Sequence, residues 1–445
     1  MDSLRRESQS DAGLEVEDLL ETWRLLDLEE RYEAFMDLPR APAEDFFLEL
    51  SAREEYELVM AMAADQRRSW MRLLPPDDAA DVVQEADDDE REGLLALLDE
   101  QTKREVRALL AYAEDDAGGL MNPRFARVRP DVSVDEAISY LRRQATATIE
   151  SLYYIYAVEA DHKLAGVVSF RDLFSAPPGK TIREIMVTDL VTSFEDMDQE
   201  ELGRLFAQYD LQAIPVVDVE GRMKGIVTVD DIVDVLQEEA TEDIQKIGGS
   251  EALEAPYLET GFFSLLRKRV SWLAVLFIGE MFTASAMGRF EHVLGSALVL
   301  GLFIPLIISS GGNSGSQAST LVIRAMALGE VTLSDWWRVV KREVMQGAVM
   351  GLLLGVLGFA RIELWQHLFQ TYGEHSMLVA LTVGVSVMGV VMFGTITGSM
   401  LPFLLRRAGL DPASASAPFV ATLVDVVGIV LYFSAATILL RGTLL

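Results

Sequence analysis

The chain has 445 residues, with 38 Lys+Arg against 70 Asp+Glu, 50% hydrophobic residues and no cysteine. The lack of cysteine excludes disulfides, thiolate metal sites and cysteine nucleophiles, and the net charge of −32 argues against a nucleic-acid partner, because phosphate contacts require a basic surface. Phe262–Leu445 holds 12 Lys+Arg and 9 Asp+Glu, so nearly all of the acidic excess precedes it. The sequence therefore predicts an acidic, water-facing part followed by an apolar membrane part.

Residues 1–120 predict an acidic helical domain. Pairs of leucines recur among acidic residues, and Pro75-Pro76-Asp77-Asp78 is a typical helix start, because the helix dipole favours acidic residues in the first turn. Met1–Gln9 is polar and is followed by no apolar segment of the secretory type. The simplest interpretation is a helical spacer that its charge keeps soluble.

Residues 121–245 contain an internal duplication. Gly166-x-x-Ser169-x-x-Asp172 recurs 59 residues later as Gly225-x-x-Thr228-x-x-Asp231, and in each copy the motif joins a predicted β-hairpin to a helix. The repeat resembles a tandem CBS pair, an α/β module that often senses adenine nucleotides. The resemblance implies that four side chains contact the phosphate and ribose of a regulator such as ATP: Ser169, Asp172, Thr228 and Asp231. Alternatively, the Ser and Thr hydroxyls only cap their helices.

An acidic connector follows, and we expect it to form a helix over residues 246–266 that reaches the membrane surface. Beyond it, five apolar stretches can cross a hydrocarbon core of ~30 Å, which takes about 20 helical residues: Val270–Gly288, Val293–Ile308, Val344–Ile362, Met377–Leu404 and Pro418–Leu440. The second is the shortest and ends in Ser309–Gln317, where we expect a helix break at membrane depth. Such backbone is tolerated only where it lines a polar cavity or is buried in protein.

The predicted fold class is thus multidomain. It combines an all-α acidic N domain (1–120), an α/β tandem CBS pair (121–245), a connecting helix (246–266) and a polytopic α-helical membrane domain with five spans (267–445). Nine basic residues flank one side of the spans: Arg267, Lys268, Arg269, Arg324, Arg338, Lys341, Arg342, Arg406 and Arg407. Arg289, Arg361 and Arg441 flank the other. Because cytoplasmic ends carry the basic excess, we expect a multi-pass protein embedded in the lipid of the plasma (inner) membrane, with its N-terminal part in the cytoplasm and its C-terminus outside.

Carboxylates inside the spans indicate an ion pathway. Asp425 lies in the last span and Glu280 in the first; a charge at the bilayer centre costs about 2.5–3.5 kcal/mol, so such residues usually serve ion movement, although an interhelical hydrogen bond or a protonated acid is the alternative for each. Glu291, near the outer end, is either an entrance ligand or an ordinary interfacial charge. The four histidines lie outside the predicted spans, so the pathway offers oxygen ligands, which suit Mg²⁺ with its retained waters.

Three membrane motifs carry a family resemblance: Ser310–Leu321, Leu401-Pro402-Phe403-Leu404-Leu405, and Asp411-Pro412-Ala413-x4-Pro418-Phe419-Val420-Ala421-Thr422-x2-Asp425. Together with the order of the domains, they resemble the MgtE-type magnesium transporter/channel family. The resemblance implies a homodimer without enzymatic activity, whose pore lies on the dimer axis and carries Asp425. It also implies that cytosolic Mg²⁺, bound between the N domain, the CBS pair and a connecting plug helix, closes the channel.

The same resemblance assigns the regulatory Mg²⁺ ligands to nine acidic residues: Asp77, Asp81, Asp218, Glu220, Asp230, Glu251, Glu254, Glu259 and Asp411. Candidates to line the pore are Gly311, Gly312, Asn313, Gln317 and Thr422. We therefore expect a Mg²⁺-selective channel or passive transporter that cytosolic Mg²⁺ closes. The alternatives are a broader divalent cation transporter for Co²⁺ or Mn²⁺, and a nucleotide-sensing membrane receptor in which Asp425 is structural.

Overall fold

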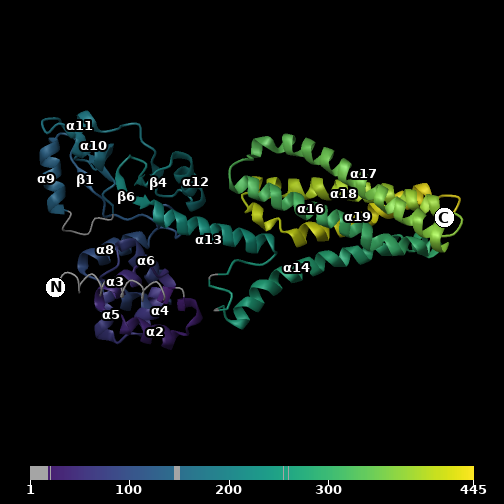
Figure 1. Ribbon diagram of the computed structural model, residues 1–445, viewed down its shortest axis with the longest axis horizontal. Coiled ribbons are helices and arrows are strands. Elements are labelled where there is room, and N and C mark those ends of the chain that lie inside the picture. The colour runs from purple at the N-terminus through teal and green to yellow at the C-terminus, as the bar shows by residue number, and fades with distance from the viewer. Residues whose placement is uncertain (1–18, 21, 145–150, 254, 259, 445) are drawn as a thin grey trace, which may run out of the picture. The chain divides into compact units, whose positions relative to one another are not determined.

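The computed structural model describes residues 19–20, 22–144, 151–253, 255–258 and 260–444. The chain divides into two compact units, Met1–Leu236 and Gln237–Leu445, which are described separately (Figure 1). The elements of the first unit are η1 (Trp23–Leu25), α2 (Leu28–Asp37), α3 (Arg40–Phe47), α4 (Ala52–Ala61), α5 (Ala64–Met71), α6 (Pro76–Gln84), α7 (Asp88–Leu95), α8 (Glu100–Leu109), β1 (Arg127–Val128), α9 (Val134–Gln144), β2 (Tyr154–Val158), β3 (Leu164–Ser169), α10 (Phe170–Ser175), α11 (Ile182–Ile185), β4 (Ser193–Phe194), α12 (Gln199–Tyr209), β5 (Ala213–Val217) and β6 (Met223–Thr228).

The helical N domain is confirmed, and local signals position its helices. Asp27 and Glu30 form a capping box at the start of α2, and Asp99 accepts hydrogen bonds from the first turn of α8. The helix predicted from Pro75-Pro76-Asp77-Asp78 is α6, which begins at Pro76 with acid in its first turn. The helices are short, and they are held together by a buried aromatic group in which the rings of Phe35 and Trp70 lie 4.9 Å apart.

The CBS pair is confirmed as two sheets with the same topology. In each sheet the first strand pairs in parallel with the second, and the second pairs antiparallel with the third: β1-β2-β3 and β4-β5-β6. The copies exchange their leading segments, because Asn122 bridges to Ile226 of β6 while Val187 bridges to Val167 of β3. This exchange explains the glycine of each repeat motif. A Cβ on Gly225 would lie 2.8 Å from the carbonyl oxygen of Asn122, and one on Gly166 would lie 2.8 Å from that of Val187.

The second unit confirms five helices long and apolar enough to cross a membrane: Phe262–Arg289, Leu298–Ala327, Leu333–Phe369, Ser376–Arg407 and Ala417–Leu439. Its elements are α14 (Phe262–Arg289), α15 (Glu291–Ser296), η2 (Leu298–Phe303), α16 (Ile304–Ala327), η3 (Leu333–Asp335), α17 (Trp336–Phe369), α18 (Ser376–Arg407), η4 (Pro412–Ser414) and α19 (Ala417–Leu439). Figure 1 shows α16, α17, α18 and α19 as neighbouring long helices, with α14 running beside α19. Their packing leaves α14 mostly exposed, as expected for a lipid-facing helix.

The expected helix break at Ser309–Gln317 is wrong. These residues lie inside the continuous helix α16, and the irregular segment comes earlier, in α15 and η2. The glycines serve close packing: a Cβ on Gly311 would lie 2.9 Å from the carbonyl oxygen of Val390 in α18, and one on Gly315 would lie 2.9 Å from that of Gly394. In lipid, helical hydrogen bonds and small-residue contacts both favour an unbroken helix, which outweighs the low helix propensity of glycine.

The connecting helix lies earlier in the sequence than expected. Helix α13 (Val229–Ile247) continues directly from β6 and ends at Ile247, so the described residues from Gly248 to Gly261 are not helical. Gly249 adopts φ +80°, and the N–H of Ser250 donates to the carbonyl of Gln245 at 3.1 Å. A glycine in the left-handed region with this backbone bond is a common helix terminator. The next helix begins at Phe262, inside the predicted connector.

Candidate ion pathway and regulatory sites

The two carboxylates predicted inside the membrane meet. The carboxyl groups of Glu280 in α14 and Asp425 in α19 lie close enough to interact with each other. Directly before Glu280, a Cβ on Gly279 would lie 2.8 Å from Cγ2 of Thr422, which is about one turn before Asp425, so the glycine lets α14 approach α19 closely. Two carboxyl groups in contact cannot both be charged without a proton or a cation between them. The pair therefore forms a candidate cation site at membrane depth. Glu291 is exposed at the start of α15 and is not part of this pair.

A polar stripe runs along the exposed face of α16. Its members are spaced by three or four residues and are exposed: Ser309, Asn313, Gln317 and Thr320. Gly311 and Gly312, expected to line the pore, are instead buried on other faces of the helix, Gly311 against α18 and Gly312 beside Ala421 of α19. Thr422 is half-buried, and its hydroxyl donates to the carbonyl of Pro418. Of the five predicted lining residues, Asn313 and Gln317 thus have the exposure that a pathway requires.

Two acids of the second unit that the resemblance assigned to regulatory Mg²⁺ make contacts near the ends of the spans. Asp411 lies 2.8 Å from the ammonium group of Lys246, at the end of α13. The Glu251 carboxylate accepts a hydrogen bond of 2.7 Å from the hydroxyl of Ser271 in α14. Glu254 and Glu259, also expected to bind Mg²⁺, lie outside the described residues.

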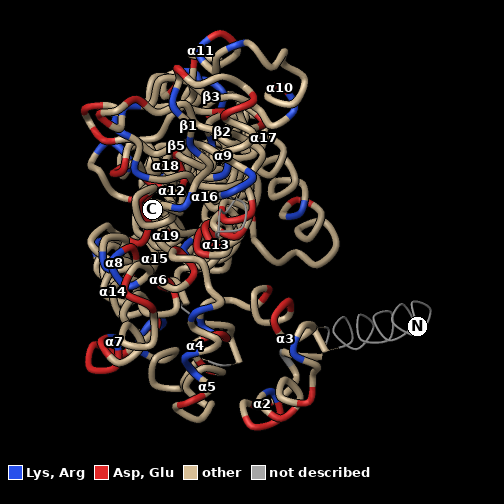
Figure 2. Tube along the Cα trace, turned by 90° about the vertical axis from the view of Figure 1, so that its left-hand side faces the viewer, with Lys and Arg blue, Asp and Glu red and all other residues tan. Residues whose placement is uncertain are grey.

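In the first unit, an acidic interface joins the N domain to the second CBS copy. Asp78 of α6 lies near Asp230 and Asp231 at the start of α13; burial, followed by the charges of Asp231 and Asp230, raises the pKa of Asp78 to about 6. Burial likewise raises the pKa of Asp231 to about 6, against the opposing hydrogen bonds from Thr228. Figure 2 shows acidic positions (red) crowded along α13. Here the N domain and the CBS pair present like charges to each other.

Glu55 extends this interface into the N domain. It is buried in α4, and burial with the charges of Asp78 and Asp81 raises its pKa to about 10. Raised acid pKa values mean that protonation favours the folded form, so these groups destabilise the interface as the pH rises through their folded-state values. The sequence did not indicate that Glu55 and Asp78 belong to this acidic interface. The acid of the α6 first turn was visible, but nothing local indicates that Asp78, rather than Asp77, faces α13.

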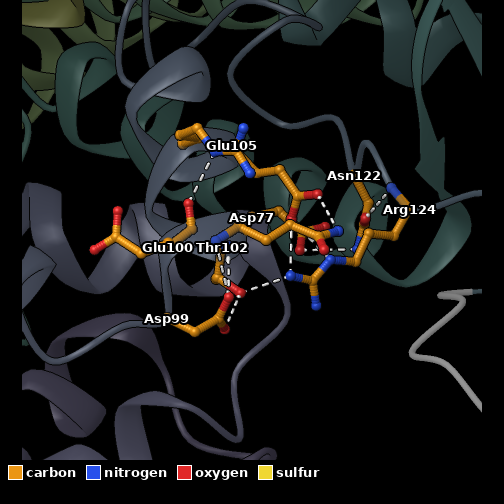
Figure 3. A network of polar contacts seen from close by, with 9 residues as sticks. Asp77, Asp99, Glu100, Thr102, Glu105, Asn122 and Arg124 are labelled. Carbon is orange, nitrogen blue, oxygen red and sulfur yellow. Dashed lines mark hydrogen bonds and ion pairs between the residues drawn. The ribbon is translucent and has the colours of Figure 1, made fainter.

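Asp77 belongs to a polar network that connects the N domain to the CBS pair (Figure 3). It is 6% exposed and accepts a 3.0 Å hydrogen bond from the side-chain amide of Asn122, whose backbone belongs to the CBS pair. Beside it, Arg124 is 2.8 Å from Glu105 and donates to the Thr102 hydroxyl. The network joins α6 and α8 to the CBS pair through hydrogen bonds and an ion pair.

Asp218 and Glu220 occupy the hairpin turn between β5 and β6. The Asp218 carboxylate accepts the backbone N–H groups of Glu220 and Arg222, and these bonds, with the nearby Lys224, hold its pKa below its usual value. This is the arrangement of an aspartate that stabilises a turn. Among the described residues, no group of three or more His, Cys, Asp or Glu side chains is arranged to hold a metal ion.

The first repeat motif caps its helix, because the Ser169 hydroxyl accepts the N–H of Asp172. In the second motif the bonds run the other way: the Asp231 carboxylate accepts both the Thr228 hydroxyl, at 2.7 Å, and the Thr228 N–H. A cavity of about 330 Å³ lies beside the second motif, between the two CBS copies, and is lined by Tyr153, Phe170, Thr228 and Asp230. Its aromatic and polar lining suits a small planar ligand.

Five apolar helices, a carboxylate pair between two of them and an N-terminal unit that contains a CBS pair define a polytopic membrane protein. Comparison with known families agrees: residues 14–115 match the MgtE intracellular N domain, 117–179 and 182–238 match CBS domains, and 304–435 match the MgtE divalent cation transporter family. The chain belongs to the MgtE family of magnesium transporters. These are transporters and not enzymes.

Relatives span most of the chain. It is 42% identical to the magnesium transporter MgtE of Thermus thermophilus, over 96% of this chain and 93% of that protein. It is 30% identical to the magnesium transporter MgtE of Bacillus subtilis, over 86% of this chain and 83% of the relative. Among solved structures, the cytosolic domain of the Mg²⁺ channel MgtE in complex with ATP matches at 40% identity and a TM-score of 0.47, covering 53% of this chain and 97% of that one.

Proposed function

We propose that this protein is a Mg²⁺-selective channel or passive transporter and that Glu280 and Asp425 form its central cation site. The observation that carries the proposal is the contact between these two carboxyl groups between α14 and α19. Hard oxygen ligands in small number fit Mg²⁺, which retains part of its water shell. Family membership supports the same ion, because relatives along the whole chain are magnesium transporters.

The polar stripe of α16 supports a homodimer. Asn313 and Gln317 are exposed on a helix of the membrane part, and polar side chains facing lipid are costly. A second copy that brings its own stripe opposite would enclose them in a hydrated pathway on the dimer axis. With the N-terminal part in the cytoplasm, as the basic residues at the span ends favour, a membrane potential contributes about 4.6 kcal/mol per 100 mV to the inward movement of a divalent ion.

Flux measurements test this function. Purified protein in liposomes should release or take up Mg²⁺ along its gradient without any nucleotide, as followed by a trapped fluorescent indicator. Excess Co²⁺ or Mn²⁺ on the outside should reduce Mg²⁺ flux only slightly. Equal flux of the three ions would favour the broader divalent transporter, and no flux of any ion would favour a nucleotide-sensing receptor.

The acidic interface of the first unit supports closure by cytosolic Mg²⁺. Asp78, Asp230 and Asp231 repel one another across the N–CBS junction, and a divalent ion placed between them would reverse the sign of that interaction. Mg²⁺ therefore favours the compact form of the soluble unit, and the ion shifts the population by its higher affinity for that form. A compact soluble unit would hold α13 in place and close the pathway.

ATP binding is a second, regulatory proposal. The cavity between the CBS copies is lined by Tyr153 and Phe170, on which an adenine ring would stack, and by Thr228, which would contact a phosphate or the ribose. Calorimetry on the full-length protein in detergent should give an ATP-specific heat that Phe170→Ala weakens about tenfold or more, as loss of a stacked base would. Unchanged ATP binding in this variant would place the nucleotide elsewhere, and no heat at millimolar ATP would leave the motifs as caps.

A further inference from the structure

Lys246 lies where two acidic elements of the second unit meet. Its ammonium group contacts the carboxylate of Glu242, one turn earlier on α13, and lies 2.8 Å from Oδ2 of Asp411, in the loop that precedes α19. Both carboxylates, through hydrogen bonds and charge, oppose the effect of burial and keep the pKa of Lys246 above its usual value. Asp411 also accepts the N–H of Ala413, which fixes its carboxylate at the start of η4. The lysine is therefore a charged bridge between α13 and this loop.

The residues around this bridge dock the end of α13 on the membrane part. Ile247 packs against the buried cluster of Ile323, Ala413 and Ala415. Just beyond the helix, a Cβ on Gly249 would lie 3.1 Å from both Pro418 and the Trp272 ring. The indole N–H of Trp272 in turn donates to Ser416, which caps α19. The α13 end thus contacts the segment that starts the span carrying Asp425.

We propose that Lys246 is a built-in counter-ion, which holds the end of α13 on the 411–418 loop without Mg²⁺. The inference rests on the proposed Mg²⁺ gating and assigns Asp411 a different partner from the one that the sequence suggested. A divalent ion bound between Glu242 and Asp411 would dissociate when its concentration falls. The ammonium group of Lys246 is covalently attached to the chain and is always present. Closure then requires Mg²⁺ chiefly at the N–CBS junction, because the membrane end of α13 is already fastened.

The first test replaces Lys246 with methionine, which keeps the length of the side chain and removes its charge. Glu242 and Asp411 are left facing each other, so the docked form is weakened. The internal Mg²⁺ concentration that halves the current in patch recordings should rise about fivefold, in line with the loss of a partly exposed ion pair. Lys180→Met, at an exposed position between the CBS copies, is the matched control and should close like wild type.

The direction in which the half-closing Mg²⁺ concentration changes distinguishes this inference from the alternative that Asp411 binds Mg²⁺. If Asp411 were a Mg²⁺ ligand that Lys246 merely blocks, Lys246→Met would free the site and lower the half-closing concentration. A lowered or unchanged concentration overturns the inference. The charge-reversed double variant Lys246→Glu/Asp411→Lys should return the concentration toward the wild-type value, whereas each single reversal should raise it; a double variant no better than the singles also contradicts the bridge.

The second test needs no ion flux, so it stands even if the proposed transport fails. The natural chain has no cysteine, and Ile247→Cys with Ala413→Cys places one pair in the docking cluster. In full-length protein, oxidation should form the disulfide at similar rates in chelator and in millimolar Mg²⁺. Adding Lys246→Met should slow it several-fold in chelator. A disulfide that requires Mg²⁺, or one that Lys246→Met does not slow, would show that the lysine does not fasten the helix.

Discussion

Replacement of Asp425 by alanine is expected to abolish Mg²⁺ flux while leaving the protein folded. The Asp425 carboxyl meets Glu280 at membrane depth, and removing it takes away half of the charge that compensates a partly hydrated dication. An ion that loses a ligand of this kind in a low-dielectric pathway loses several kcal/mol of stabilisation, because Coulomb energies there are far larger than in water. Liposome flux with a trapped Mg²⁺ indicator should fall to the level of protein-free vesicles.

Asp425→Asn provides the sharper comparison, since it keeps the shape and removes the charge. Flux should fall as far as in Asp425→Ala, and Glu280→Gln should reduce flux to a smaller extent or alter selectivity. Glu363→Gln, which neutralises a carboxylate near the end of α17, is the matched control and should transport normally. Elution at the wild-type volume in detergent would establish that assembly is intact. Wild-type flux through Asp425→Asn would remove this residue from the pathway.

Neutralising the N–CBS junction is expected to leave the channel open at internal Mg²⁺ that closes the wild type. Asp78→Asn with Asp230→Asn removes one charge from each side of the interface. Like charges about 4 Å apart cost about 4 kcal/mol at an effective dielectric near 20. Bound Mg²⁺ stabilises the closed form by relieving this repulsion. With two of the three charges removed and only Asp231 left, Mg²⁺ has a much smaller preference for the compact form, so it shifts the population far less. Patch recordings with controlled internal Mg²⁺ measure the effect.

The pH dependence of closure follows from the same charges. Burial raises the pKa of Asp78 and Asp231 to about 6, so protons favour the compact form below that pH and their contribution is lost as the pH rises through it. Closure should therefore depend most strongly on Mg²⁺ above pH 6.

The control for the junction variant is Asp45→Asn with Asp89→Asn, at exposed positions of the N domain. It removes the same amount of charge and should close like wild type. If the Asp78→Asn/Asp230→Asn variant also closed like wild type, Asp78 and Asp230 would be ordinary solvated groups.

The amino-acid sequence was sufficient to predict the domains, their order and the five spans. Apolar length alone identified five spans, because a helix must satisfy its own backbone in lipid. The repeated Gly-x-x-Ser/Thr-x-x-Asp motif indicated the CBS pair, since each glycine marks a place where the other copy's leading segment approaches. Asp425 and Glu280 stood out as carboxylates in apolar runs. In each case the signal is local or periodic, so it can be read without knowing what packs against it.

What only the tertiary structure decided was which groups face each other. Ser309–Gln317 suggested a broken helix, yet the glycines are accounted for by the backbone of α18, which the sequence of α16 cannot reveal. Asp77 suggested a Mg²⁺ ligand but contacts Asn122, while its neighbour Asp78 faces α13; one residue along a helix turns the side chain by about 100°, and the choice of face depends on partners far along the chain. The sequence predicts a metal ligand at Asp411 but does not indicate that Lys246, 165 residues earlier, lies 2.8 Å from its carboxylate. Composition and spacing record what a segment prefers, whereas the partner of a charged group is decided by packing between segments distant in sequence.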